Sequence, residues 1–254
     1  MLLAIDIGNS NTTVGCFTGD KPAATFRSAT RSERTGDEIA LLLSQFLAQR
    51  QLPQPDAVVA ASVVPRLTPV WRRLVQQTYE LEPLFVNDQV KLNIIIDYPN
   101  PHEIGADRLC NAAAAYDRYG GPVVVVDFGT ATNFDIVTTA GAYIGGVLAP
   151  GIETSHQALA QRAAQLFRVT LEKPEQVIGR STEQALQSGF FHGAVGQTDY
   201  LLGMIAAEMG ATDLQVVATG GLAGAVAAES KFIKAVEPDI TLQGLRLIYE
   251  LNKS

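Results

Sequence analysis

The chain has 254 residues, of which 47% are hydrophobic and 18% are charged, and its formal net charge is -7. This length supports a large core in one big domain or two ordinary ones, and the negative charge disfavours non-specific nucleic-acid binding. Only two cysteines occur, no signal peptide opens the chain, and no apolar run approaches the roughly 18 to 20 residues of a membrane span, which together predict a cytoplasmic α/β protein.

The first half opens with an apolar strand that leads into Asp6, Gly8 and a run of small polar residues, before the chain turns apolar again. This order predicts a β-hairpin over residues 2–18. Further predicted elements are a strand over 21–30, a helix opened by a Thr35/Glu38 capping box, a strand over 57–64, a helix over 65–80, a short strand over 83–87 and a strand over 94–98. Strands that alternate with helices predict parallel β-strands with covering helices, which together with the hairpins give mixed sheets flanked by helices.

The second half repeats this plan. Four valines lead into Asp127, Gly129 and small hydroxyl residues, and a hairpin is expected over 122–137. It is followed by a strand over 141–151, a helix from about 154, a long helix opened by a Ser181/Gln184 capping box and reaching 209, a strand over 214–219, and helices near 222 and over 242–251. The repetition predicts two similar domains, 1–117 and 118–254, facing each other across a nucleotide cleft. The last helix is free to pack back on the first domain.

Each strand–Asp–Gly–hydroxyl turn suits a nucleotide phosphate tail. Backbone N–H groups and hydroxyls bind phosphate oxygens, while carboxylates hold a metal ion. The Thr219-Gly220-Gly221 turn would let an adenine or ribose lie against the backbone. The chain has no P-loop, no kinase HRD/DFG set and no GxGxxG opening a helix. His102, His156 and His192 are scattered and are interpreted as polar surface or loop residues.

A proline-rich loop after Tyr98 leads to Gly105-Ala106-Asp107-Arg108 at the start of a predicted helix. Asp107 here has a purely structural alternative, because the helix macrodipole favours aspartate at helix N-termini. Structural alternatives also stand for Tyr98 as a strand-edge aromatic and for Thr182 as a helix-capping residue. A turn-capping role is less satisfactory for Asp6 and Asp127, because that motif occurs twice.

The duplicated hairpins resemble the actin-like ATPase superfamily of acetate and sugar kinases, Hsp70 and actin, whose domains are ribonuclease H-like. The finer pattern resembles type III pantothenate kinases over essentially the whole chain. The segments that carry the resemblance are Asp6-Ile7-Gly8-Asn9-Ser10-Asn11-Thr12, Tyr98-Pro99-Asn100-Pro101, Gly105-Ala106-Asp107-Arg108, Asp127-Phe128-Gly129-Thr130-Ala131-Thr132 and Thr219-Gly220-Gly221. Asn133 departs from the pattern, because the family usually has another threonine there, and we expect a retuned contact with ATP and not lost activity.

The resemblance implies ATP-dependent phosphorylation of pantothenate, the first step of coenzyme A synthesis, with Mg²⁺ and a monovalent cation such as K⁺ or NH₄⁺. It also implies a homodimer with the substrate site at or near the subunit interface, and no nucleic-acid or membrane partner. Asp107 would be the general base, Asp127 would bind the monovalent cation, and Asp6 would order Mg²⁺ through water. Pantothenate would contact Tyr98, Gly105, Ala106, Asp107, Arg108 and the partner subunit's Thr182. ATP would contact Asp6, Gly8, Asn9, Ser10, Asn11, Thr12, Gly129, Thr130, Thr132, Thr219, Gly220 and Gly221.

Two alternatives remain open. One is another kinase of the same superfamily acting on a sugar or a short acid, which the Gly-Ala-Asp-Arg element and the short chain disfavour. The other is a non-catalytic nucleotide-binding regulator, which would bind ATP without acceptor-dependent release of ADP. Asp107 speaks against the regulator, because a binding module needs no base beside the γ-phosphate.

Overall fold

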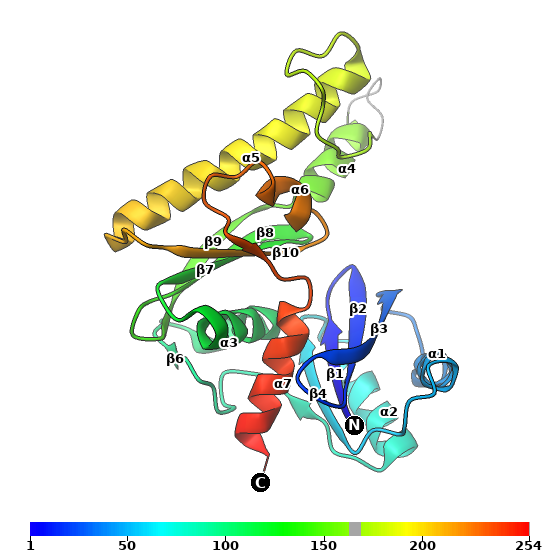
Figure 1. Ribbon diagram of the computed structural model, residues 1–254. Helices are drawn as coiled ribbons and strands as arrows, with labels where there is room; N and C mark the ends of the chain where they lie inside the picture. Colours follow the sequence, from blue (N-terminus) through cyan, green and yellow to red (C-terminus); the bar gives the residue numbers. More distant parts are fainter. Residues whose placement is uncertain (163–168, 254) are drawn as a thin grey trace. The chain divides into compact units, whose positions relative to one another are not determined.

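The computed structural model describes residues 1–162 and 169–253 (Figure 1). It divides into two compact units, one of residues Met1–Arg118 with Asp239–Ser254 and one of Tyr119–Pro238. Each unit contains a mixed β-sheet flanked by helices. Residues 86–122 contain three elements: β6 (Ile95–Ile96), the 3₁₀ turn η1 (Pro101–Glu103) and α3 (Ala106–Tyr119).

The sheet of the first unit has the order β3-β2-β1-β4-β5. Its strands are β1 (Leu2–Ile7), β2 (Asn11–Phe17), β3 (Pro22–Ala29), β4 (Ala57–Ser62) and β5 (Leu84–Phe85). The first three strands pair antiparallel, whereas β4 runs parallel to both β1 and β5. Side chains of β1 such as Ile5 pack against Leu43 and Trp71 of helices α1 (Gly36–Gln49) and α2 (Thr68–Tyr79). These buried contacts form the core of the first unit.

The opposite face of this sheet is covered by the last helix of the chain, α7 (Ile240–Asn252), which lies beside β1, β4 and β2 (Figure 1, red). A Cβ atom at Gly15 would lie 3.0 Å from Leu242 Cδ1, and one at Gly244 would lie 2.1 Å from the carbonyl oxygen of Cys110. Glycine at both positions therefore lets α7 approach the sheet and α3 closely. The Asn252 side chain adds hydrogen bonds to both backbone groups of Lys91, each of 2.9 Å.

The sheet of the second unit contains the order β11-β10-β7-β8-β9. Its strands are β7 (Val123–Phe128), β8 (Ala131–Val137), β9 (Ala142–Pro150), β10 (Gln215–Gly220) and β11 (Ala235–Val236), and its helices are α4 (Ile152–Arg162), α5 (Thr182–Met209) and α6 (Ala223–Ala227). The strands β1 and β7 show the same order of buried and half-buried residues, and so do β2 and β8. The predicted duplication of the hairpin is therefore confirmed residue by residue.

The two predicted capping boxes have different outcomes. Thr35 and Glu38 form the complete box, in which each side chain accepts the other residue's backbone N–H. At α5, Ser181 Oγ accepts the N–H of Gln184 at 3.2 Å, but Gln184 Oε1 accepts the N–H of Arg180. The second box is thus half formed, because the glutamine side chain reaches one residue further back than the motif requires.

Two other expectations are corrected, and one strand was missed. The second helix begins at Thr68 and not at Pro65, because the Leu67 N–H first closes a tight turn onto the carbonyl of Val64. The strand β11 was not expected from its sequence. His156 is buried and not a surface residue, and its Nε2 accepts the N–H of Val169 at 3.0 Å. Among the residues that the structure describes, no helix is both long and apolar enough to cross a membrane.

Candidate active site

The first strand–Asp–Gly turn joins β1 to β2. Its Gly8 N–H donates to the carbonyl of Asn11 at 3.0 Å, while Asn9 and Ser10 are exposed. Asp6 lies at the end of β1, directly opposite Thr13 of β2. Directly opposed residues of antiparallel strands point to the same face with Cβ atoms about 4.5–5.5 Å apart. The turn therefore presents a carboxylate and a hydroxyl together on one face, beside an exposed backbone loop.

The start of α3 contains Asp107, whose Oδ1 accepts the N–H of Arg108 at 2.8 Å. A Cβ atom at Gly105 would lie only 2.5 Å from this oxygen and 3.4 Å from Val63 Cγ1. The Val63 N–H in turn donates to the carbonyl of Ile7 at the end of β1. Glycine at position 105 thus lets the carboxylate of Asp107 fold back over the helix start, close to the end of the strand that contains Asp6.

Burial raises the pKa of Asp107, an effect that the N–H and the guanidinium of its neighbour Arg108 oppose in part. The thiol of Cys110 has a pKa well above its ordinary value, first because it is buried and then because of the negative charges of Asp6 and Asp107. The carboxylates of Asp6 and Asp107 therefore both raise the pKa of the same buried thiol. A carboxylate with a raised pKa is a stronger base than an ordinary aspartate, as general-base chemistry near neutral pH requires.

The second strand–Asp–Gly turn joins β7 to β8, and Asp127 occupies in it the position that Asp6 has in the first. It lies opposite Asn133 of β8 and beside Thr219 of the parallel strand β10. Gly220 has a φ of +92°, and a Cβ atom there would lie 2.8 Å from Asp127 Oδ1. A Cβ atom at Gly129 would lie 3.6 Å from the same oxygen. The carboxylate therefore lies between two positions occupied by glycine, where a ligand meets no side chain.

The structure does not bring every predicted site residue to the faces of the two aspartates. Thr12 is buried on the other face of the first hairpin, and its hydroxyl is 2.9 Å from that of Thr30. Thr132 is likewise buried, because successive side chains in a strand point to opposite faces. The side chains beside the aspartates are instead those of Thr13 and Asn133. Sequence reasoning missed Thr13, which the strand register alone assigns to this face.

Comparison with known proteins identifies the family. A family model described as Type III pantothenate kinase matches residues 2–203. A type III pantothenate kinase of Frankia alni is 47% identical over 253 residues, which cover 99% of this chain and 100% of the relative. One of Moorella thermoacetica is 45% identical over 255 residues, with 99% and 100% covered. The chain belongs to the type III pantothenate kinase family.

The fold is shared more widely than the sequence. A ROK family glucokinase of Streptomyces griseus, solved with glucose and AMPPNP, matches with a TM-score of 0.51 at 14% identity, covering 97% of this chain and 98% of the glucokinase. This likeness confirms the predicted duplicated actin-like α/β fold.

The residues of the second turn suit a cation that prefers oxygen ligands. Asp127 and its two neighbours on the adjacent strands, Thr219 and Asn133, offer a carboxylate, a hydroxyl and an amide oxygen. The amide oxygen, Asn133 Oδ1, is buried and has no hydrogen-bond partner among the described residues. Among residues 1–162 and 169–253, no cluster of three or more His, Cys, Asp or Glu side chains is placed to hold a metal. A divalent ion in this kinase would therefore depend on one or two carboxylates, water and phosphate oxygens, the arrangement that Mg²⁺ commonly takes.

The remaining predicted contacts are spread over both units. Tyr98 is half-buried and Ala106 is buried in the first unit, whereas Thr182 is exposed at the first position of α5. Gly221 is exposed, and a Cβ atom there would meet nothing within 4 Å. Open space at Gly221 suits the approach of a flat ring to the backbone.

Proposed function

We propose that this chain transfers the γ-phosphoryl group of ATP to the primary hydroxyl of pantothenate, forming 4'-phosphopantothenate for coenzyme A synthesis. The observation that carries the proposal is Asp107 at the start of α3. Its carboxylate is half-buried, its pKa is raised, and it shares the neighbourhood of Cys110 with Asp6 of the phosphate turn. Transfer of a phosphoryl group to a hydroxyl requires a base that takes the hydroxyl proton, and Asp107 lies next to a turn proposed to bind phosphate.

On the acceptor side, Asp107 takes the hydroxyl proton while the pantothenate oxygen bonds to the γ-phosphorus. The bond between that phosphorus and the bridging oxygen breaks, and ADP leaves with the electron pair. Because the transition state is loose, the proton leaves late and an aspartate suffices. Arg108 holds the pantothenate carboxylate with its planar guanidinium fork, and Tyr98, Gly105 and Ala106 line the pocket.

On the nucleotide side, each phosphate turn contributes backbone and side-chain groups to the phosphates. In the first turn these come from Gly8, Asn9, Ser10 and Asn11, and in the second from Gly129 and Thr130. Asp6 orders the waters of Mg²⁺, which neutralises phosphate charge when bound, and Asp127 holds the monovalent cation together with Asn133. Thr219, Gly220 and Gly221 face the nucleoside. Thr12 and Thr132 support the turns from behind.

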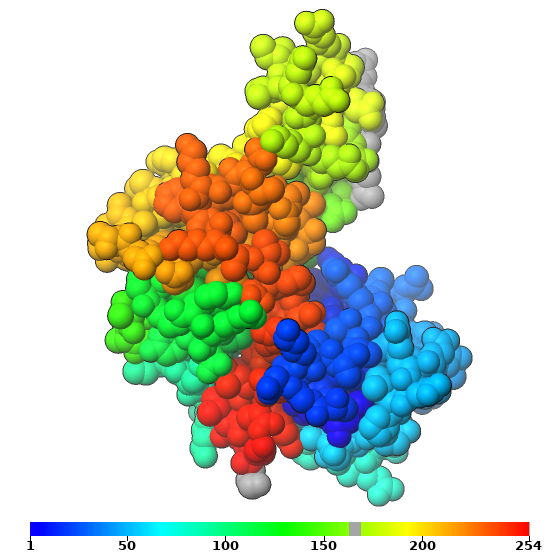
Figure 2. Space-filling view, in the orientation of Figure 1, coloured from blue at the N-terminus to red at the C-terminus, as the bar shows by residue number. Residues whose placement is uncertain are grey.

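We also propose a homodimer in which the partner subunit's Thr182 reaches the pantothenate site. The helix α5 supports this proposal, because its far end lies at the surface (Figure 2, gold) and Tyr200 and Met204 are 69% and 53% exposed. Cβ atoms at Gly189 and Gly193 would meet nothing within 4 Å, so a second helix has room to approach. We expect light scattering to give twice the chain mass of 27.1 kDa. A monomer mass at assay concentration would contradict the dimer.

The deciding measurement is ADP release with ATP and Mg²⁺, with and without pantothenate, in K⁺ and in Na⁺ buffer. We expect release only with pantothenate, and faster in K⁺ than in Na⁺. A sugar or short acid that replaces pantothenate would point to another kinase of the superfamily. Bound ATP with no acceptor-dependent release of ADP would point to a regulator.

A cytoplasmic location accords with Cys16 and Cys110, which are both free and buried.

A further inference from the structure

The same backbone hydrogen bond holds the two phosphate turns from behind. The Thr30 N–H, just after β3, donates to the carbonyl of Ser10 at 2.9 Å. The Gly151 N–H, just after β9, donates to the carbonyl of Thr130 at 3.2 Å. Ser10 and Thr130 are the last turn residues before β2 and β8. The end of each third strand therefore fixes the final peptide of its turn, and the duplication preserved this bond.

Side chains add a contact at or next to each turn, and here the two units differ, because the first contact is to a residue of β2 and the second is to the turn itself. In the first unit the hydroxyls of Thr30 and Thr12 share a hydrogen bond of 2.9 Å. In the second, Thr154 Oγ1 donates to the carbonyl of Thr130 at 2.7 Å. A Cβ atom at Gly151 would lie 2.3 Å from that same carbonyl oxygen, so the chain after β9 touches the turn directly.

We infer that Thr30 and Thr154 are positioning residues for ATP, which hold the phosphate turns in their binding conformation without touching the nucleotide. The inference rests on the proposed function of these turns. Because the turn residues Asn9, Ser10, Gly129 and Thr130 are exposed, few packing contacts restrain them. Hydrogen bonds to the neighbouring strand end then set how well the turns are preorganised, and preorganisation lowers the entropic cost of binding.

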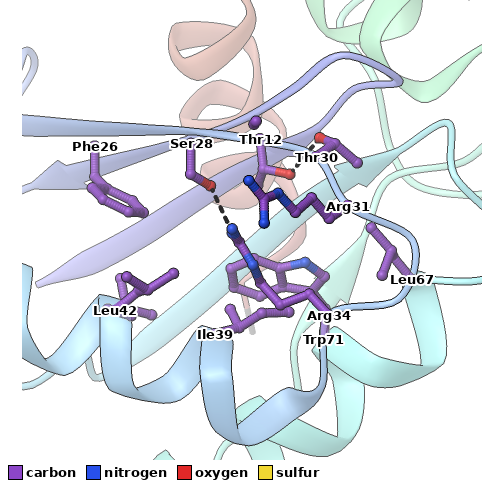
Figure 3. A pocket seen from close by; sticks show the side chains of 12 residues that line it. Thr12, Phe26, Ser28, Thr30, Arg31, Arg34, Ile39, Leu42, Leu67 and Trp71 are labelled. Carbon is purple, nitrogen blue, oxygen red and sulfur yellow. Dashed lines mark hydrogen bonds between the residues drawn. The ribbon is translucent and has the colours of Figure 1, made fainter.

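Figure 3 shows the surroundings of the Thr12–Thr30 pair. The Thr12–Thr30 pair lies at the edge of a cavity of about 20 Å³, room for about one water molecule. Its polar side has Arg34, whose Nη1 donates to Ser28 Oγ at 3.4 Å, and its floor is apolar: Phe26, Ile39, Leu42, Leu67 and Trp71. A smaller side chain at position 30 would enlarge this space, so the informative change removes the hydroxyl and keeps the volume.

The test is Thr30→Val, which keeps the shape of the side chain and removes its hydrogen bond. We expect the KM for ATP to rise about threefold to tenfold, the range that one net hydrogen bond supports, and the KM for pantothenate to stay within about twofold. Thr30→Ser restores the hydroxyl and should restore the KM for ATP. Thr25→Val, at an exposed position of β3, is the matched control.

Thr154→Val and Thr154→Ser test the second turn in the same way. An unchanged KM for ATP in both valine variants would overturn the inference, and so would an equal rise of both KM values with a lower Tm, which indicates general destabilisation. Direct binding of a fluorescent ATP analogue separates this inference from the proposed function. If the parent protein binds ATP but shows no pantothenate-dependent ADP release, the proposed function fails. Weaker binding of the ATP analogue by Thr30→Val would still support the positioning role of Thr30.

Discussion

Asp107→Asn is expected to lower kcat by about 10²- to 10⁴-fold while the protein stays folded, because general-base assistance contributes on that order. The amide oxygen of asparagine can still accept the Arg108 N–H, so the start of α3 keeps its geometry. Steady-state kinetics with pantothenate measure the loss. Asp117→Asn, at an exposed position on the same helix, is the control and should keep full activity. A variant at position 107 that keeps more than about a third of the turnover would remove Asp107 from the role of base.

The same substitution should make the protein more stable at neutral pH. Because burial raises the pKa of Asp107, the folded state holds this proton more tightly than the unfolded chain does. The stabilisation is complete below the unfolded pKa and is lost as the pH rises through the folded value, so the charged carboxylate is a cost at pH 7. We expect Asp107→Asn to raise the Tm at pH 7 and to leave it nearly unchanged at pH 3.5.

The kcat/KM of the parent enzyme should fall on the acidic side at a pH above the ordinary aspartate pKa of about 3.9.

Gly220→Ala is expected to lower kcat/KM by at least about tenfold and to abolish the effect of K⁺. A side chain at φ +92° is strained by roughly 1–3 kcal/mol. Its Cβ atom would also lie 2.8 Å from Asp127 Oδ1 and 2.5 Å from the Phe128 carbonyl oxygen, so the carboxylate must move. The measurements are kcat/KM in K⁺ and Na⁺ buffer and the Tm shift on adding K⁺, which reports cation binding without turnover.

Gly210→Ala separates backbone strain from the displaced carboxylate. Gly210 also has a positive φ, +61°, but it ends α5 and a Cβ atom there meets nothing within 4 Å. This variant should lose some stability and keep both its kcat/KM and its response to K⁺. If Gly220→Ala and Gly210→Ala behave alike, the position of the Asp127 carboxylate is not what matters for the cation.

The parts of the fold that could be predicted from the sequence depend on short-range patterns. The two hairpins follow from apolar runs that end in Asp and Gly, and the Thr35/Glu38 box follows from spacing alone. The start of α2 depends on a local turn between Val64 and Leu67, and the burial of His156 depends on its contact with Val169, a residue of another segment. Gln184 satisfied the motif in sequence, yet its side chain bonds the N–H of Arg180.

The sequence predicted which residue types form the site, but not which face of each hairpin their side chains occupy. Position in a turn suggested Thr12 and Thr132 as phosphate ligands, whereas the register of β1 with β2 and of β7 with β8 turns both side chains away from the aspartates. The same register brings Thr13 and Asn133 beside them. Thr30 and Thr154 had no signal at all, since their contacts depend on which strand end meets which turn.

The return of α7 to the first sheet has a consequence for the order in which the protein can be assembled on the ribosome. The second unit, Tyr119–Pro238, is continuous in sequence, whereas the first unit is built from two segments that flank it. The first unit lacks the helix that covers β1 and β4 until residues 239–254 have been translated. Domains usually fold in order of synthesis, starting from the N-terminus. Here the order of completion is inverted: all residues of the second unit are translated before α7, which the first unit, with the Asp107 carboxylate, needs for its complete structure.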